Sequence, residues 1–367
     1  MPINPLKSLF SRKSTDEGAK EQLSPDSPRY AYAFPSPYLR PRILVLVGKV
    51  SAPYFLSLHY VLLRLHNTES LAFFVLESAE VSQWTAQKSP EALVEQVVAD
   101  TQPTLVIFSQ LGLPHSDLLP ALFKAKKASI VYQIDSPEVA ISQTLEQALL
   151  YAATPHLGDR LSAQFPDKTV FSAQATPYLD FLISTEPSAQ KPLTVGYVGS
   201  SESQEDLNAI ALNLAQILTD YPQVQFETFG SISMPEALKS FGKRVRTHEA
   251  IADYAAFLNQ LQQLNWAVGL IPLQDTETNR CKTPSKYLAY TACGIATVAS
   301  DGIVYGQFKA DQQLLLTQQD RWYDSIQQLI DSEPQRTTLV DNAQTYCQQN
   351  FSLGIVEAQI KELIALA

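Results

Sequence analysis

Three cations lie within seven positions of one another in a chain whose formal net charge is −10. They are Arg280, Lys282 and Lys286, in the stretch DTETNRCKTPSKYLAYTACG. The pattern predicts a helix with Thr283 as N-cap and Pro284 in its first turn, ended by Gly294. Free N–H groups and the positive end of the helix dipole make such an N-terminus a site for an anion. Cations there are unfavourable unless an anion neutralises them, so the pattern favours a bound diphosphate.

The same charges have an ordinary alternative explanation. Arg280 and Lys282 can pair with Asp275 and Glu277 on a solvated loop, with no ligand involved. The chain contains neither GxGxxG nor GxxxxGK[ST], which argues against a nicotinamide enzyme and a P-loop ATPase.

The overall composition limits the ligands that such a protein can hold. The chain has 37 acidic against 27 basic residues, which argues against a nucleic-acid binder because non-specific phosphate binding needs a broad basic face. Three cysteines without a CxxC pair indicate neither a disulfide framework nor a zinc site, and favour a reducing compartment. No stretch has the ~20 apolar residues of a membrane span. We therefore expect a cytoplasmic protein, with peripheral attachment at the inner membrane face as an alternative.

The elements that position these cations follow an α/β alternation. The length of 367 residues predicts two domains. Continuous apolar strands such as ILVLVG, TLVIFSQ and SIVYQID alternate with helical stretches, which predicts parallel sheets covered on both faces. We expect a flexible tail over 1–40, a first domain over 41–183, a linker over 184–192, a second domain over 193–345 and a C-terminal helix over 346–367. Two doubly wound domains would face each other across a cleft, with the ligand between them.

A longer segment around the cations resembles a known family. WAVGLIPL, NRCKTPSKYLAY and GIATVAS, all between Asp253 and Ser300, are similar to the nucleotide-sugar motif of bacterial GT-B glycosyltransferases of the group-1 type. VGYVGSSESQEDL resembles the first strand and loop of that family's donor domain, and VYQIDSP and YAATPHLGDRL resemble stretches of its other domain. The resemblance implies a GT-B architecture of two Rossmann-like domains.

The resemblance also implies a set of site residues. Holding the donor diphosphate would fall to Gly199, Ser200, Arg280, Lys282, Ser285 and Lys286. Contacts with the nucleoside or the sugar are expected from Asn279, Tyr290 and Glu277. Neither a metal nor a cofactor is expected, because fixed cations would neutralise the charge on the departing nucleoside diphosphate.

The chain departs from the family pattern at acidic positions. Ala289 stands where the family usually has a glutamate that is expected to hold the ribose, and an earlier acidic position falls on Cys281. A histidine common in the family near Ser203 is also missing. Either another carboxylate takes the place of the glutamate, or the donor site is weakened; the candidates are Glu277, Glu202 and Glu205.

Candidate catalytic residues come from the first domain. Asp135 follows the strand SIVYQI, and His115 follows the strand TLVIFSQ. Either side chain could contact an acceptor hydroxyl or take its proton. The alternatives are a capping role for Asp135 and a structural role for His115. His156 has the same two possible roles as His115. The run KAKK at Lys124–Lys127 could touch a lipid-phosphate-linked acceptor, although cations are favourable at a helix C-terminus anyway.

Three functions remain open from the sequence. The first is a glycosyltransferase that moves a sugar from a nucleoside diphosphate to a hydroxyl of a glycan or lipid-linked acceptor in cell-envelope polysaccharide or glycoconjugate biosynthesis. The second is a catalytically degenerate GT-B protein that binds a nucleotide or a partner enzyme. The third is a sugar-nucleotide epimerase of the same fold.

Overall fold

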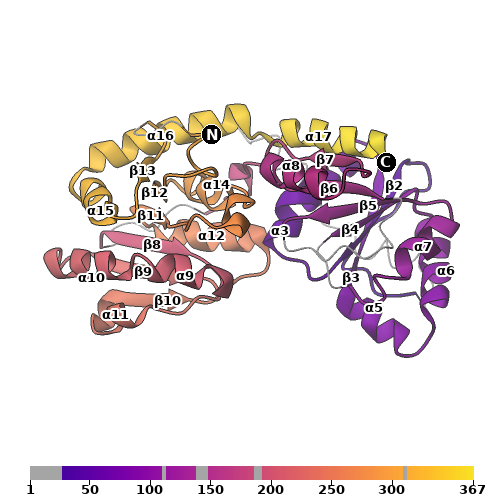
Figure 1. Cartoon of the computed structure of the whole chain (residues 1–367), viewed down its shortest axis with the longest axis horizontal. Coiled ribbons are helices and arrows are strands. Elements are labelled where there is room, and N and C mark those ends of the chain that lie inside the picture. The colour runs from indigo at the N-terminus through magenta and orange to yellow at the C-terminus, as the bar shows by residue number, and fades with distance from the viewer. Residues whose placement is uncertain (1–26, 110–112, 138–147, 186–191, 309–311) are drawn as a thin grey trace. The chain divides into compact units, whose positions relative to one another are not determined.

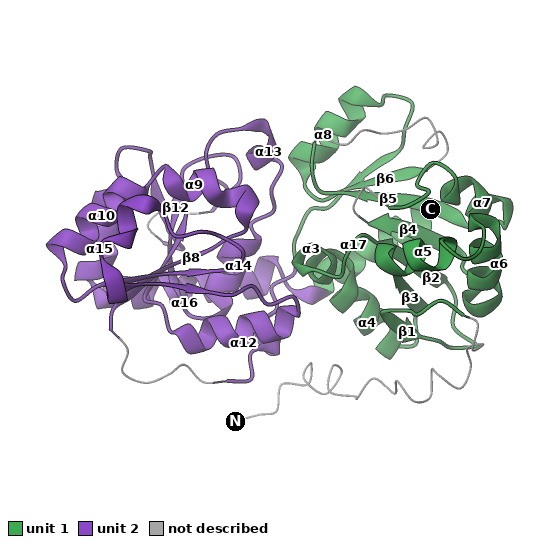
Figure 2. Cartoon of the chain, turned by 90° about the horizontal axis from the view of Figure 1, so that it is seen from below, with its two compact units in different colours: residues 1–176, 354–367 green, residues 177–353 purple. Residues whose placement is uncertain are grey.

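The computed structural model describes residues 27–109, 113–137, 148–185, 192–308 and 312–367. Two compact units are found: unit 1 comprises residues 1–176 and 354–367, and unit 2 comprises residues 177–353 (Figure 2). Within the described residues, no helix combines the length and the apolar composition needed to cross a membrane.

Unit 1 is built on a seven-stranded sheet in its described part, with the order β1-β3-β2-β4-β5-β6-β7. Figure 1 labels β2 to β7, and Figure 2 labels β1. The strands are β1 Tyr32–Phe34, β2 Arg42–Val47, β3 Ala72–Glu77, β4 Leu105–Ser109, β5 Ser129–Ile134, β6 Leu149–Ala152 and β7 Val170–Ser172. β1 pairs antiparallel with β3, and the other pairs are parallel. β2 is buried along its whole length, as its continuous apolar sequence predicts.

The helices of unit 1 alternate with these strands. They are α3 Ala52–Tyr54, the π-helical turn η1 Phe55–His59, α4 Tyr60–Asn67, α5 Ser78–Thr85, α6 Pro90–Thr101, α7 Leu119–Ala125, α8 Pro155–Gln164 and the terminal α17 Leu353–Leu366. Ser89 begins α6 and Thr154 begins α8, each accepting a hydrogen bond from a backbone N–H three residues later. β1 lies inside the stretch predicted as a tail, so the sheet of unit 1 begins before residue 41.

Unit 2 has a parallel six-stranded sheet in its described part, with the order β10-β9-β8-β11-β12-β13. The strands are β8 Thr194–Val198, β9 Gln225–Phe229, β10 Val245–His248, β11 Val268–Ile271, β12 Ala296–Ser300 and β13 Leu315–Thr317. In chain order this is 3-2-1-4-5-6, the order of the Rossmann fold. Strand order reverses between β8 and β11, and ligands of such sheets bind at the carboxyl ends of strands at this point.

Helices cover both faces of the unit 2 sheet. They are α9 Gln204–Asn208, α10 Ala211–Asp220, α11 Glu236–Lys239, α12 Tyr254–Leu264, α13 Glu277–Arg280, α14 Ser285–Ala292, α15 Trp322–Asp331 and α16 Glu333–Asn350, with 3₁₀ turns at Asp180–Leu182, Ser201–Ser203 and Gly242–Arg244. The apolar side chains of α10 and α15 share one core with β8, β9, β11 and β12. On the other face Trp266 packs over Gly196 and Tyr290 packs over Gly269.

Several predicted element boundaries change in the structure. The expected C-terminal helix over 346–367 is divided between α16 and α17, with Phe351 and Ser352 between them. The segment expected to be a loop after β11 contains α13. Most of the predicted linker, residues 186–191, lies outside the described residues.

A buried histidine makes the stability of unit 1 depend on pH. His59, which ends η1, is 5% exposed; its Nδ1 lies 3.0 Å from the Tyr54 hydroxyl, and its ring contacts Tyr32 and Phe73. Burial lowers the pKa of His59 to about 3. Below the unfolded pKa of ~6.5 the unfolded chain takes up a proton that the folded chain does not, so stability falls as pH falls.

Because only the unfolded chain protonates His59 in this range, we expect the free energy of unfolding to fall by about 2 kcal/mol between pH 7 and pH 5. Urea unfolding of the whole chain at both pH values measures it. His59→Gln keeps a hydrogen-bond acceptor for Tyr54 and should make stability less dependent on pH. Replacing the exposed His115 by Gln should leave the pH dependence of stability unchanged. An equally steep dependence in His59→Gln would show that other groups cause it.

Candidate functional site

The segment after β11 carries Arg280 on the short helix α13. Thr276 begins this helix, with its hydroxyl accepting a hydrogen bond from Asn279 N at 3.2 Å. The Arg280 guanidinium makes a bidentate pair with Asp275, with distances of 2.6 Å and 2.7 Å, and lies 3.9 Å from Glu277. Arg280 therefore lies beside Asp275 and Glu277, the carboxylate partners that the alternative explanation predicted. This segment was expected to be a loop, but Arg280 lies on the helix α13.

Asp206 on α9 connects this segment to the rest of unit 2. Its side chain is 5% exposed and accepts hydrogen bonds from Gln274 N at 2.9 Å and from Asn279 Nδ2 at 3.1 Å. Lys282 Nζ lies 3.8 Å from the other carboxylate oxygen. The partner of Lys282 is therefore Asp206, in place of the expected Asp275 or Glu277, and Asn279 holds the loop through Asp206 and the Gln274 carbonyl.

Sequence reasoning missed Asp206, although a signal was present. Glu202 and Glu205 in the same stretch were considered as replacement carboxylates, and both are exposed. Asp206 lies four residues before Ile210 and eight before Leu214, on the stripe that is buried in the core. A carboxylate on the apolar stripe of a helix indicates a buried, partnered group.

Lys286 lies in the first turn of α14 and is partly buried. Its Nζ donates a hydrogen bond to the Tyr197 hydroxyl at 3.1 Å and lies 4.5 Å from the centre of the Tyr197 ring. Burial and the nearby charge of Lys282 lower the pKa of Lys286 to about 7, against the opposing effect of Asp206. Lys286 is therefore partly uncharged near neutral pH.

Helix α14 begins one residue later than predicted. Pro284 occupies the N-cap position, makes no side-chain cap hydrogen bond, and is followed by Ser285 as the first helical residue. Thr283 is therefore not the N-cap, which corrects the sequence prediction. Leu288 N donates to Pro284 O at 3.1 Å. The N–H groups before Leu288 in the first turn have no carbonyl partner within the helix. Gly294 has φ of 71°, which confirms the predicted left-handed residue after the helix.

The turn after β8 contributes less than predicted. Gly199 N donates to Phe229 O at 3.0 Å, so this N–H is used within the sheet and is not open to an anion. A Cβ on Gly199 would lie 2.5 Å from the Tyr197 ring, which explains the glycine by close packing. Ser200 precedes the 3₁₀ turn Ser201–Ser203 and accepts a hydrogen bond from Ser203 N.

Tyr290 has a structural role in the sheet. Its side chain is fully buried, and its hydroxyl accepts a hydrogen bond from Val198 N at 2.8 Å and donates one to Leu270 O at 3.2 Å. The hydroxyl thus connects β8 to β11 at the point where strand order reverses. The prediction that Tyr290 contacts a donor finds no support in this geometry.

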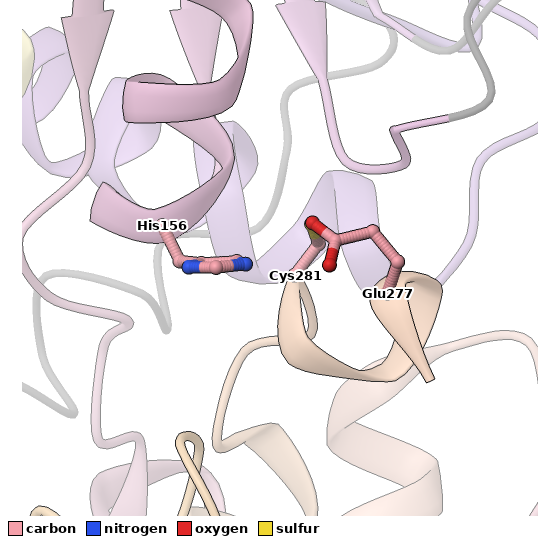
Figure 3. A group of neighbouring side chains, drawn as sticks. All are labelled: His156, Glu277 and Cys281. Carbon is pink, nitrogen blue, oxygen red and sulfur yellow. The ribbon is translucent and has the colours of Figure 1, made fainter. Parts of the chain in front are cut away.

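The remaining donor-side positions lie on or near α13 and α14. Glu277 is the first residue of α13 and Cys281 directly follows this helix (Figure 3). Cys281 is buried, as is Ala289 on α14. A small pocket within unit 2 lies at the carboxyl ends of β11 and β12. It is lined by Leu273, Gln274, Asp275, Asn279, Arg280, Ser300, Asp301, Gly302, Ile303, Val304 and Tyr305.

The candidate residues of unit 1 belong to separate segments. Asp135 directly follows β5 and is exposed. His115 is also exposed, has φ of 56°, and its Nε2 lies 3.1 Å from the Thr85 hydroxyl. His156 is the second residue of α8 (Figure 3). Asp135 is at the strand edge where ligands of parallel sheets bind, which keeps it a candidate.

Comparisons with known proteins place the fold. No protein-family model and no curated protein matches the sequence significantly. Among solved structures, Anabaena HepE (Alr3699) in complex with UDP and glucose is 16% identical, with a TM-score of 0.61 over 89% of this chain and 100% of that one. A glycosyltransferase from Rickettsia africae is 7% identical, with a TM-score of 0.62 over 88% and 98%.

A third solved structure is also similar to this chain. The UDP-forming α,α-trehalose-phosphate synthase of Burkholderia xenovorans is 10% identical, with a TM-score of 0.56 over 88% of this chain and 98% of that one. At such low identities the likeness establishes the fold. The chain therefore has the GT-B fold, two Rossmann-like domains, that is found among glycosyltransferases.

Proposed function

We propose that this protein is a glycosyltransferase that takes a sugar from a uridine diphosphate donor and transfers it to a hydroxyl acceptor. The observation that carries the proposal is the cation cluster of unit 2. Lys282, which pairs with the buried Asp206, and Lys286, which is bonded to Tyr197, lie at the N-terminus of α14 beside the strand-order reversal. Uridine is supported by HepE, whose structures contain UDP or UDP-glucose.

The proposed chemistry is electrostatic. As the bond between the sugar and the diphosphate breaks, negative charge develops on the leaving group. Ammonium groups and helix N–H groups fixed at that position stabilise this charge without moving. We propose that Lys282, Lys286 and the first-turn N–H groups of α14 act in this way, with no metal ion required. Arg280 joins them when its guanidinium leaves Asp275.

The acceptor side of the proposal rests on unit 1. Asp135 is our candidate for contact with the acceptor hydroxyl, because it follows β5 at the carboxyl edge of the sheet. His115 is the second candidate. We propose a glycan or lipid-linked acceptor of cell-envelope polysaccharide or glycoconjugate biosynthesis, the assignment that the sequence resemblance supports.

A second function is favoured by one specific position. Ala289 is buried on α14 and has no carboxylate with which to hold a ribose. A bidentate carboxylate of that kind is worth a few kcal/mol, since hydrogen bonds to charged groups contribute ~1.5–3 kcal/mol each. A protein that binds the nucleotide or a partner enzyme without turnover is the alternative.

Two measurements on the whole chain separate these functions. Calorimetry with UDP and GDP tests binding, and release of nucleoside diphosphate from a panel of UDP-sugars and GDP-sugars tests turnover, with and without hydroxyl acceptors. We expect UDP to bind and UDP to be released from a UDP-sugar. Binding without any release would favour the non-catalytic function, and a changed sugar nucleotide without acceptor or release would indicate an epimerase. Neither binding nor release would refute both the glycosyltransferase and the nucleotide-binding form of the alternative.

A further inference from the structure

Lys286 is an unusual cation for an anion site, because its surroundings in the free protein disfavour its charge. The ammonium has one hydrogen-bond acceptor in the described structure, the Tyr197 hydroxyl at 3.1 Å, although an ammonium has three N–H groups to donate. Tyr197 in turn donates to Ser203 O at 3.2 Å. The ring of Tyr197 covers one side of the amine. The amine is therefore partly covered by protein, and Tyr197 is its one protein acceptor in the described structure.

The charges around Lys286 come from two residues of the described structure. Tyr197 on β8, Tyr290 on α14 and Tyr305 after β12 remain neutral near pH 7, because burial raises the pKa of each hydroxyl. Lys282 contributes a positive charge, which opposes protonation of Lys286. Asp206 contributes a negative charge, but this carboxylate already accepts two hydrogen bonds and pairs with Lys282.

We propose that unit 2 binds its nucleoside diphosphate with uptake of a proton by the Lys286 amine. The inference rests on the proposed function and specifies how pH regulates that site. A diphosphate beside Lys282 and Lys286 adds negative charge and further hydrogen-bond acceptors next to the amine, so the charged form becomes the stable one. The proton comes from solvent, and no covalent bond changes. By linkage, affinity falls as pH rises above the range in which the free amine is protonated.

Proton uptake is measured directly by calorimetry in buffers of different ionisation enthalpy. UDP is the probe at pH 7.5 and 8.5, where its terminal phosphate is already ionised because its last pKa is ~6. Since burial lowers the pKa of Lys286 to about 7, we expect an uptake of roughly 0.8 proton at pH 7.5 that approaches one at pH 8.5. The dissociation constant should rise nearly tenfold per pH unit in this range.

Two arginine variants assign the proton to a residue. Lys286→Arg carries a permanent charge and should bind UDP with almost no proton uptake. Lys243→Arg is the matched control, because Lys243 is exposed in the 3₁₀ turn Gly242–Arg244 before the edge strand β10, and its proton uptake should equal that of the unchanged protein. Equal uptake in Lys286→Arg would overturn the assignment.

A third variant decides the question if Lys286→Arg does not bind. Asp206→Asn keeps an oxygen acceptor for Gln274 N and Asn279 Nδ2 but removes the negative charge. Asp206 favours the charged form of the Lys286 amine. Loss of the Asp206 charge should therefore lower the pH at which UDP binding begins to take up a proton, and an unchanged pH would contradict the proposal. UDP binding without proton uptake overturns the inference alone, whereas absence of UDP binding overturns the proposed function as well.

Discussion

Replacing Lys286 by methionine is expected to weaken UDP binding by roughly 10-fold to 100-fold at pH 7. The reason is the loss of one charge-assisted hydrogen bond to the diphosphate, which contributes ~1.5–3 kcal/mol. Methionine is one atom shorter than lysine and keeps an unbranched apolar chain beside the Tyr197 ring, so most of the packing is conserved. Because burial disfavours the amine charge in the free protein, the melting temperature should not fall. Calorimetry with UDP and a thermal melt measure both effects.

The matched control for this prediction is Lys243→Met. Lys243 is an exposed lysine in the 3₁₀ turn Gly242–Arg244, which precedes the edge strand β10, and β9 separates β10 from β8. This variant removes the same charge from the same unit and should leave UDP affinity within about twofold, since exposed charges at a distance are screened by salt. Equal losses in both variants would mean that net charge, and not the α14 site, determines binding.

Replacing Gly196 by alanine is expected to destabilise unit 2 by about 3 kcal/mol. Gly196 lies in the middle of β8, and a Cβ there would lie 2.0 Å from the Trp266 ring. The ring cannot move away freely, because Trp266 is buried and its Nε1 donates to the buried Glu227 carboxylate at 2.8 Å. Either the indole loses this hydrogen bond or β8 shifts beside the proposed site. Chemical denaturation followed by tryptophan fluorescence measures the loss.

Gly302→Ala is the control for the glycine prediction. A Cβ on Gly302 has no heavy atom within 4 Å among the residues that the structure describes, and its φ lies outside the left-handed range. The expected change in stability is within about 0.5 kcal/mol. Gly196→Ala with wild-type stability would show that Trp266 does not cover β8 as described.

The strands that carry the fold were predictable because they are buried on both faces. β2, β4, β5 and β11 are continuous apolar runs, and the structure confirms each of them. β10 was not predicted, because its sequence VRTH is polar and the strand is largely exposed at the edge of the sheet. β1 was not predicted either, since three half-buried residues in a polar, proline-rich stretch give no periodic signal.

The cations of the site were predictable from spacing, but their partners were not. The sequence places Arg280, Lys282 and Lys286 near a helix start, as the structure confirms. The pairing of Lys282 with Asp206 joins residues 76 positions apart along the chain, so it depends on how α9 packs beside the β11 loop. The buried position of Tyr290 likewise follows from the pairing of β8 with β11, which no local pattern encodes.

A crystal structure of the protein with UDP would test the central claim most directly. We predict diphosphate oxygens within ~3 Å of the Lys282 and Lys286 ammonium groups and of a first-turn N–H of α14. UDP bound elsewhere on the chain, with Lys286 still bonded to Tyr197 and Lys282 to Asp206 as in the free protein, would contradict it.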